Sequence, residues 1–405
     1  MGRARCSKGS RGLSLLEVVV ATALMLVVTA AVFALTDPAR STALVQFEST
    51  DVQQRLRVAA EALVRDLMMA GAGAYAGAQS GSLIGWLAPV TPYRLGAVGA
   101  DPPGTYRSDA ITVLYVPATA AQTTLSAALA PGQLTLRVNF ERGCPLNQDL
   151  CGFTSGTTLL VYDTYGNSDT FTLTSVAGNS GQLTVNSPGG VLQTSYAIGS
   201  KVVQAVQRAY YLKRHAILGF DQLVYSDGSA NPEVAVADHV VGLEFEYYGD
   251  PQPPGITAVA ADPVGPWTTY GPRPPTPDLT PTAYPSGENC TFTFDPIGGG
   301  HAPRLEVIGG DPSRRSLIRL SAAELADGNV WCPDPGAATR FDADLLRIRK
   351  IAVRLRIESA IDGLRGPAGA LFIRGGTARD GRRFLPDREV RFQIAPPNLN
   401  AGLSP

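Results

Sequence analysis

Residues 12–17 read Gly-Leu-Ser-Leu-Leu-Glu and open an apolar run that continues to Leu35. Between Leu13 and Leu35 the single charged residue is Glu17. At about 1.5 Å of rise per residue, a helix over this run is long enough to cross a hydrocarbon core of about 30 Å. The run therefore predicts a transmembrane helix over residues 13–36.

The residues before Gly12 carry the charges that set the expected orientation. They include Arg3, Arg5, Lys8 and Arg11 and no acidic residue. Positive charge next to a span keeps that end in the cytoplasm, so the remainder of the chain is expected to face outward. A secretory signal places small residues after its apolar segment, whereas Gly12 precedes it. Cleavage after Gly12 would therefore leave the span attached to the protein.

A basic leader over residues 1–12 that ends in Gly, followed by an apolar residue, Ser, two aliphatic residues and Glu, resembles the type IV prepilin signature. The resemblance implies that prepilin peptidase cuts after Gly12, that the new terminus at Leu13 is N-methylated, and that Glu17 assists filament assembly. Leu13 stands where that family usually has Phe. The alternative is an uncleaved single-pass anchor in which Gly12 and Glu17 occur by chance.

Glu17 leaves two interpretations open. An ionised carboxylate inside a bilayer costs a few kcal/mol unless it finds a partner. That partner is expected to be the amino-terminal amine of a neighbouring subunit, which would couple assembly to charge neutralisation. The alternative is a carboxyl that stays protonated or snorkels toward the headgroups.

A second helical pattern follows the span, over residues 37–72. Its apolar residues recur at helical spacing and predict a stripe that lies on a sheet: Val52, Leu56, Ala59, Leu63 and Leu67. Asp37-Pro38 predicts an end or a kink before this stretch, because an interior Pro loses a backbone hydrogen bond. Gly71 and Gly73 predict where the helix ends.

Residues 57–71 resemble the corresponding stretch of PilW-type minor pilins, which commonly has Arg-Asp-Leu-Arg-Met-Ala-Gly. Here Met68 stands where the second Arg is usual. The resemblance implies an α+β, pilin-like fold, in which a long amino-terminal helix packs on an antiparallel β-sheet with β-rich insertions. We interpret Arg65 and Asp66 as a solvated helix turn rather than an assembly contact.

Residues 73–405 are expected to form an outward-facing, β-rich globular region. Short β-prone runs separated by Gly- and Asn-rich turns predict a small β insertion at about residues 130–207. Apolar alternation at Leu243, Phe245 and Tyr247 predicts a strand that, in PilW-type proteins, closes the main sheet. Residues 250–303 are rich in Pro and Gly and predict a long irregular excursion.

Two further strands are predicted near the carboxyl end, at residues 348–357 and 389–394. The first alternates apolar with basic residues. Its arginines, Arg349, Arg354 and Arg356, are expected on an exposed face of an edge strand. We interpret that face as a solvated edge that resists aggregation, with an anionic partner as the alternative.

Cysteine usage fits an outward-facing body, because Cys6 lies in the leader and the other four make an even set. Proximity predicts the disulfides Cys144-Cys151 and Cys290-Cys332, the second of which would pin the irregular excursion. Four cysteines allow three pairings, so the crossed alternatives remain open.

The sequence offers little catalytic chemistry. No hydrolase, metalloprotease or P-loop string occurs, and His215, His239 and His301 lie far apart. We interpret Asp342 and Asp344 as a turn that precedes a strand, and we expect no cofactor or metal. Calcium held by oxygens of residues 162–169 or 225–228 is an alternative.

The overall charge disfavours one class of partner. Loss of the leader's four positive charges changes the formal net charge from -1 to -5, so no nucleic-acid partner is expected. The resemblance implies a non-catalytic minor pilin of the bacterial inner membrane that primes or tips a type IV pilus. Its implied partners are prepilin peptidase, other major and minor pilins, the inner-membrane assembly platform and membrane lipid. Alternatives are a minor pseudopilin of a type II secretion system and a membrane-anchored outward-facing enzyme.

Overall fold

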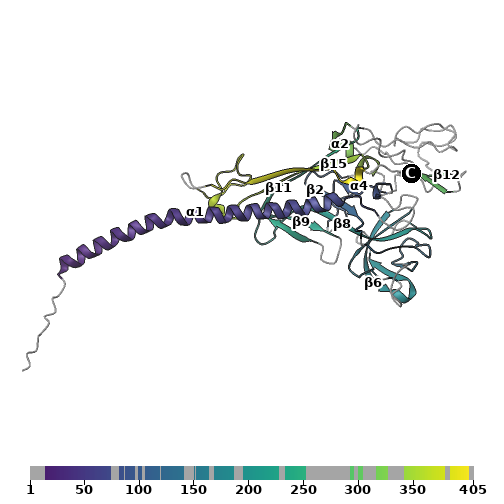
Figure 1. The fold of residues 1–405 in the computed structure, drawn as a ribbon, viewed down its shortest axis with the longest axis horizontal. Coiled ribbons are helices and arrows are strands. Elements are labelled where there is room, and N and C mark those ends of the chain that lie inside the picture. Colours follow the sequence, from purple (N-terminus) through teal and green to yellow (C-terminus); the bar gives the residue numbers. More distant parts are fainter. Residues whose placement is uncertain are drawn as a thin grey trace, which may run out of the picture. The chain divides into compact units, whose positions relative to one another are not determined.

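The computed structural model is an α+β protein built from one long helix and antiparallel sheets (Figure 1). It divides into two compact units, Met1–Gln53 with Ser359–Asp387, and Gln54–Glu358 with Arg388–Pro405. The structure describes residues 14–73, 82–85, 87–95, 99–102, 105–118, 120–140, 150, 152–163, 168–186, 195–227, 233–251, 292–295, 300–303, 316–326, 342–378 and 384–400.

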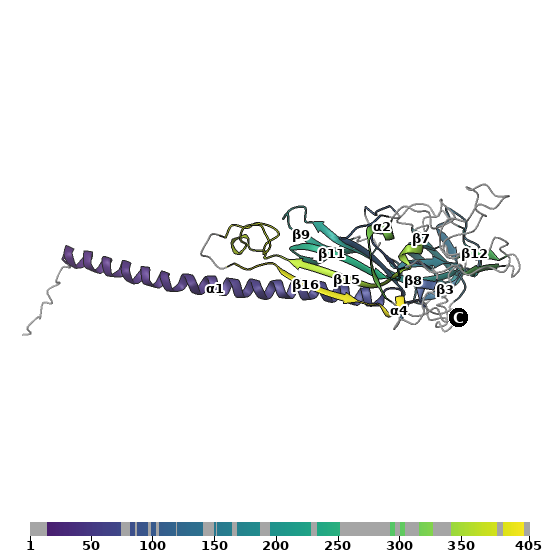
Figure 2. The ribbon, with the colours of Figure 1, turned by 90° about the horizontal axis from the view of Figure 1, so that it is seen from above.

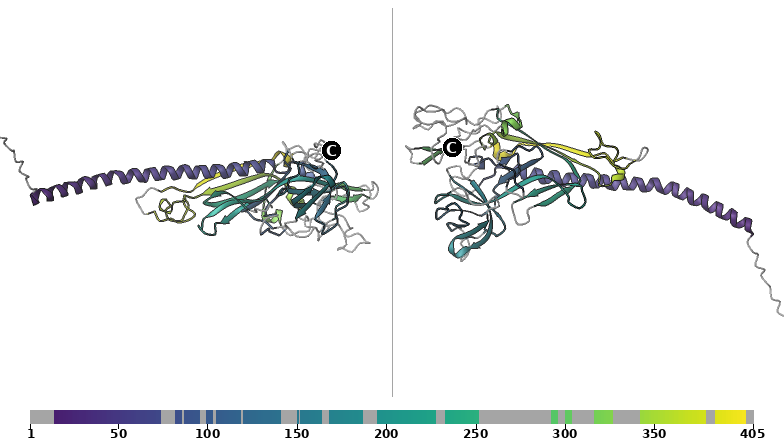
Figure 3. Two further views of the ribbon diagram at one scale, coloured as in Figure 1. Left: turned by 90° about the horizontal axis from the view of Figure 1, so that it is seen from below. Right: turned by 180° about the vertical axis from the view of Figure 1, so that it is seen from behind.

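Helix α1 (Leu15–Met69) is a single element of 55 residues and forms one continuous coil in every view (Figures 1, 2 and 3). Of the two outcomes expected at Asp37-Pro38, an end or a kink, the end of the helix is therefore wrong, and the kink stays a prediction. An interior Pro costs about 3 kcal/mol, but each further residue adds a hydrogen bond once a helix exists. The segments before and after Pro38 are long enough to offset that local loss.

The expected end of α1 near Gly71 is confirmed. Gly71 has a φ of +80°, the left-handed conformation that closes a helix at little cost only for Gly. Its N–H donates to the Leu114 carbonyl at 3.0 Å, and its own carbonyl accepts from Leu83 N at 2.8 Å. These bonds tie the helix end to a strand and to the short 3-10 helix η1 (Leu83–Gly85).

The larger sheet has ten antiparallel strands in the order β1-β2-β8-β5-β6-β7-β4, with β3 and β9 also on β8 and β10 on β9. Their bounds are β1 (Val90–Thr91), β2 (Ala110–Tyr115), β3 (Gln122–Thr124), β4 (Thr135–Arg137), β5 (Thr158–Tyr162), β6 (Ser168–Ala177), β7 (Gln182–Asn186), β8 (Lys201–Arg214), β9 (Asp221–Ser226) and β10 (Val234–Asp238).

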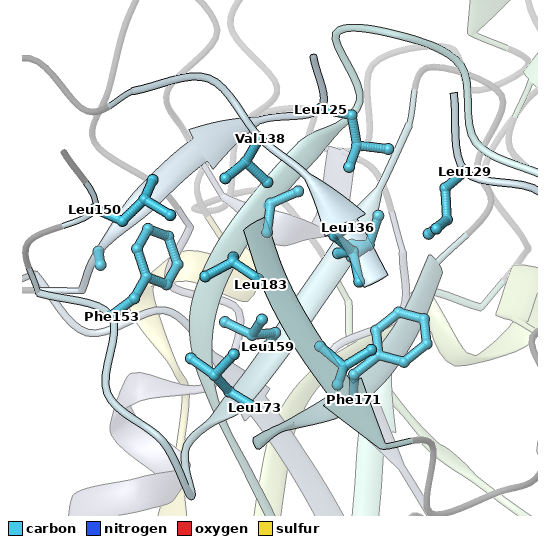
Figure 4. Close-up of a cluster of buried hydrophobic side chains, with 14 of the residues drawn as sticks. Leu125, Leu129, Leu136, Val138, Leu150, Phe153, Leu159, Phe171, Leu173 and Leu183 are labelled. Carbon is cyan, nitrogen blue, oxygen red and sulfur yellow. The ribbon is translucent and has the colours of Figure 1, made fainter. Parts of the chain in front are cut away.

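The region of the predicted β insertion contains a hydrophobic cluster that begins before residue 130. It has a core of its own, to which Ala121, Leu125 and Leu129 contribute from before residue 130. Leu136, Leu159, Phe171 and Leu183 converge on this core from separate strands (Figure 4). Full burial of one such side chain stabilises a fold by about 1.5–3 kcal/mol.

The smaller sheet has four strands in the order β14-β11-β15-β16, all antiparallel. Their bounds are β14 (Ile318–Leu320), β11 (Val240–Gly249), β15 (Ile348–Ile357) and β16 (Arg388–Ile394). Burial of Leu243, Phe245 and Tyr247 confirms the predicted alternation. The expectation that this strand closes the main sheet is wrong, because β11 pairs with β14 and β15, which come much later in the chain.

Two expectations for the remaining segments also change. Strand β15 lies between β11 and β16, so it is not an edge strand. The excursion at residues 250–303 contains an antiparallel hairpin, β12 (Phe292–Asp295) with β13 (Gly300–Pro303), and its residues 252–291 lie outside the described ranges. The short helices are η2 (Gly178–Ser180), α2 (Ala322–Leu325), α3 (Asp342–Leu345), η4 (Asp362–Leu364) and α4 (Pro397–Asn400).

Candidate functional site

The first part of α1 is an apolar segment whose described side chains are all exposed. Leu15–Ala34 has a mean hydropathy of 2.5, and none of that segment is buried. A core helix of the same composition would be buried, whereas every described side chain here is exposed. The segment is long and apolar enough to cross a membrane, which fits a single-pass anchor.

Glu17 lies in the first turn of this segment, and its carboxylate caps the helix. Glu17 Oε2 accepts a hydrogen bond from Ser14 N at 2.9 Å, and Ser14 Oγ accepts one from Glu17 N at 3.2 Å. This reciprocal pair is a capping box, which satisfies two backbone donors that the helix cannot. A carboxylate here also interacts favourably with the helix dipole.

The hydroxyls within the segment bond to its own backbone. Thr22 Oγ1 donates to the Val18 and Val19 carbonyls at 3.0 and 2.9 Å, and Thr29 Oγ1 donates to Met25 O at 2.7 Å. A polar group in hydrocarbon needs a hydrogen-bond partner within the protein, and both threonine hydroxyls have one. Glu17 is therefore the chemically distinctive side chain of the segment.

Several predicted site residues lie outside the described ranges. Gly12 and Leu13 precede Ser14, where the description begins. The cysteines of both predicted disulfides, Cys144, Cys151, Cys290 and Cys332, also lie outside it, so cleavage, methylation and cysteine pairing stay predictions.

A buried polar cluster at the other end of α1 contradicts the interpretation of Asp66 as solvated. The Asp66 side chain is fully buried, while that of Arg65 is 68% exposed. Asp66 Oδ2 accepts from Arg208 Nη1 at 2.6 Å and from the Tyr210 hydroxyl at 2.5 Å, and Oδ1 accepts from the Tyr115 hydroxyl at 3.1 Å. Because Tyr115 lies on β2 and the other two partners on β8, the cluster holds the carboxyl-terminal end of α1 on two strands.

The electrostatics of this Asp66 cluster keep its tyrosines neutral. Burial, with the Asp66 charge as the next cause, raises the pKa of Tyr115 to about 12 and also raises that of Tyr210. Burial works against the Arg208 cation, but the hydrogen bond and charge of Asp66 outweigh it and raise the Arg208 pKa. The guanidinium also lies 4.6 Å from the centre of the Tyr225 ring. The cluster is thus an ion pair surrounded by aromatic rings.

A second buried ion pair overturns the expected exposure of Arg349. Arg349 is 1% exposed, and its Nη2 lies 2.8 Å from Asp250 Oδ2. Arg347 is also buried and donates to the carbonyls of Asp250 and Pro251 at 3.0 and 2.9 Å. These two arginines fix the chain where the excursion begins, which is a structural task.

The other predicted basic residues on β15 lie on its opposite face. Arg354 is half exposed and pairs with Glu389 at 3.0 Å and with Glu244 at 3.6 Å, and Arg356 is half-buried. Because β15 has strands on both sides, these charges do not protect an edge.

The predicted histidines and acidic residues with described side chains contact other parts of the fold. His215 Nδ1 accepts from the Leu218 N–H at 3.1 Å, and the His239 ring stacks on Phe220 at 4.3 Å. Asp344, on the one-turn helix α3 before β15, is buried 3.4 Å from Arg347. Among described residues, no three His, Cys, Asp or Glu side chains come together as metal ligands would.

Comparisons with known proteins add no assignment: no protein-family model, curated protein or solved structure matches this chain.

Proposed function

We propose that this protein is a non-catalytic minor pilin that takes part in priming or tipping a type IV pilus. The observation that supports this most directly is that the two ends of α1 have different surroundings. Its first part is a wholly exposed apolar segment with Glu17 at the start, and its last part is fixed to an antiparallel sheet through Asp66. A subunit held in a membrane before assembly and in a helical filament core afterwards needs both properties.

The proposed route begins with prepilin peptidase, which removes residues 1–12 and exposes an amine at Leu13. The positive leader orients the chain in the bacterial inner membrane, with the body on the outer side. Other pilins and the inner-membrane assembly platform then bring subunits together. The sequence signature of residues 12–17 supports this route, and no catalytic residues are required of the protein itself.

Glu17 supplies the proposed assembly chemistry. Its carboxylate accepts the Ser14 N–H, which compensates only part of the cost of placing a charge near hydrocarbon. A neighbouring subunit's new amine would pair with the carboxylate and neutralise it once subunits meet. Because neither charge is fully compensated alone in lipid, the pairing favours the assembled state.

The test replaces Glu17 in cells with an active prepilin peptidase. Glu17→Gln keeps a hydrogen-bonding side chain without charge, and Glu17→Val removes both. We expect each variant to insert and lose its leader normally, but to enter sheared filaments about tenfold less, which corresponds to about 1.4 kcal/mol. Glu61→Gln, at an exposed position of the same helix, is the matched control.

Normal incorporation of both Glu17 variants would contradict the assembly role. A strain that lacks this protein distinguishes a role in a type IV pilus from a role in a type II secretion system. Loss of surface filaments with intact protein secretion supports a minor pilin, and the reverse result would assign the chain to a type II pseudopilus.

A further inference from the structure

The segment Ser359–Asp387, between β15 and β16, belongs to the same compact unit as the membrane segment of α1. Glu48 joins the two parts of this unit. Its side chain is buried, and its Oε1 accepts hydrogen bonds from the Ser359 hydroxyl at 3.1 Å and from Ala360 N at 2.6 Å. Figure 2 shows the segment alongside α1, extending toward the amino-terminal end of the helix. We call it the juxtahelical segment.

The juxtahelical segment is folded rather than extended. Its backbone is cross-linked by hydrogen bonds from Gly376 N to Gly366 O and from Leu385 N to Leu364 O, each at 2.9 Å. Phe372 and Leu385 are 3% and 4% exposed and form a small interior. The segment can therefore hold other side chains in fixed positions.

Several of the side chains that it holds outward are large and apolar. Leu371 is 61% exposed and Ile373 is 46% exposed, on either side of the buried Phe372. Ile361 and Phe384 are each 38% exposed. We call these four residues the apolar patch. In the same unit, Phe47 of α1 is 74% exposed. Large apolar side chains that an ordered segment holds outward are available to a partner.

The position of the apolar patch points to lipid as that partner. Glu48 lies fourteen positions after Ala34, where the membrane segment ends, and this offset corresponds to about 21 Å along the helix axis. Headgroups add about 5–8 Å on each side of the hydrocarbon core. Because the juxtahelical segment extends back along α1 toward the span, its outer face lies near the height of the headgroups. Modest tilt of the helix closes the remaining gap.

The net charge of the juxtahelical segment, counted from its sequence, also favours lipid as the partner. Residues 359–387 contain five Arg and three Asp, a net charge of +2, in a mature chain whose net charge is -5. A basic segment next to a span is attracted to anionic lipid.

We propose that the apolar patch inserts among the outer-leaflet phospholipid headgroups of the bilayer that α1 crosses. Before assembly it then acts as a second membrane contact, which sets the tilt and rotation of the subunit. The inference rests on α1 being a membrane span and not on incorporation into a filament, so failure of the Glu17 test leaves it standing.

The test uses the full-length protein reconstituted in phosphatidylcholine vesicles, with and without phosphatidylglycerol. A photoreactive diazirine amino acid is placed at Leu371. The matched control carries it at Ile217, which is 88% exposed in the turn between β8 and β9. After illumination, mass spectrometry identifies what each position has labelled. We expect phospholipid adducts at residue 371, at least about tenfold above those at residue 217, and more with phosphatidylglycerol.

Equal lipid labelling at both positions would overturn the proposal, as would adducts at residue 371 only with a second copy of the chain. Leu371→Ser combined with Ile373→Ser provides an independent readout. Both side chains point out of the fold, so the variant is expected to keep its circular dichroism spectrum. In this double variant the photoreactive amino acid is placed at position 384 instead. Its labelling of phospholipid should fall about tenfold, and unchanged labelling would contradict the role of the apolar patch.

Discussion

Asp66 and Arg208 lie 142 positions apart in the chain, yet their side chains meet at 2.6 Å in a site where the carboxylate is fully buried. The contact joins the end of a 55-residue helix to the middle of the 14-residue strand β8. Two tyrosine hydroxyls complete the coordination of the carboxylate. The carboxyl-terminal end of α1 is therefore held on these strands by a polar contact as well as by apolar packing.

Asp66→Asn should destabilise the protein strongly. Removal of one partner from a buried ion pair costs about 3–5 kcal/mol, and the lower end applies because the Arg208 side chain keeps 21% exposure. Denaturant unfolding in detergent micelles measures the free energy of unfolding. Glu61→Gln, which breaks an exposed i,i+4 pair on the same helix, should leave that free energy unchanged. Equal effects of the two substitutions would contradict our account of the Asp66 cluster.

Stability should fall at alkaline pH through the tyrosines of the same cluster. Burial and the Asp66 charge raise the folded-state pKa of Tyr115 to about 12, against an unfolded value of about 10. Below about pH 10 both states keep the proton and the full stability is present. Between about pH 10 and 12 only the unfolded state loses the proton, so stability declines. Tyr115→Phe should flatten this part of the stability curve, and an unaltered slope would show that other groups cause the decline.

Gly71→Ala should destabilise the end of α1 for two separable reasons. A φ of +80° costs an L-residue about 1–2 kcal/mol, and a Cβ would lie 3.1 Å from Leu399 Cδ2 and 3.2 Å from Pro89 Cγ. Gly199→Ala is the matched control, since Gly199 has a φ of +90° with nothing within 4 Å of the added Cβ. We expect thermal unfolding to show a larger loss for Gly71→Ala. Equal losses of thermal stability in the two variants would mean that the side chains around Gly71 move aside without cost.

Gly12→Val should block removal of the leader. The prepilin signature requires a small residue before the cut, and the branched side chain would exclude the scissile bond from the peptidase. Intact-mass measurement of the membrane-purified protein should give a chain that starts at Leu13 for the parent and at Met1 for the variant. Retention of Met1 in the parent, in cells with active prepilin peptidase, would reject the processing prediction.

Cys144 should pair with Cys151, and Cys290 with Cys332. The second pairing closes a long loop and should stabilise the exported protein by about 4 kcal/mol on the loop-entropy relation. Peptide mapping without reduction identifies the linked pairs, and Cys6→Ser in the leader is the neutral control. Free thiols at all four positions, or crossed pairs, would show this assignment to be wrong.

Local periodicity predicted the helices and strands well, because the apolar residues on the buried face of a helix or strand recur at the period of that element. Four of the five predicted stripe residues of α1 are buried, and Leu56 is half-buried. Leu243, Phe245 and Tyr247 are buried as their alternation predicted. What periodicity could not give is which strands pair across long separations. The placement of β11 in the smaller sheet depends on β15, about one hundred residues later, and no local signal carries that information.

The sequence analysis did not predict that Asp66 and Arg349 are buried, although both occupy positions on the apolar face of their helix or strand. Asp66 lies three residues after Leu63 and seven after Ala59, so it shares the apolar stripe of α1. Arg349 is in step with Ile351 and Val353, whereas Arg354 lies on the other face. A charge in phase with an apolar face predicts a buried pair, but the identity of its partner depends on the tertiary fold.

Strand β8 passes without a break from the β insertion into the body of the larger sheet. Residues near its start pair with β3 and β5, and residues near its end pair with β2 and β9. A pull on the insertion that is resisted at α1 therefore travels lengthwise along one strand. The ladder hydrogen bonds on both sides of β8 are loaded together, in shear, rather than opened one after another. One continuous strand thus joins the insertion to the rest of the larger sheet.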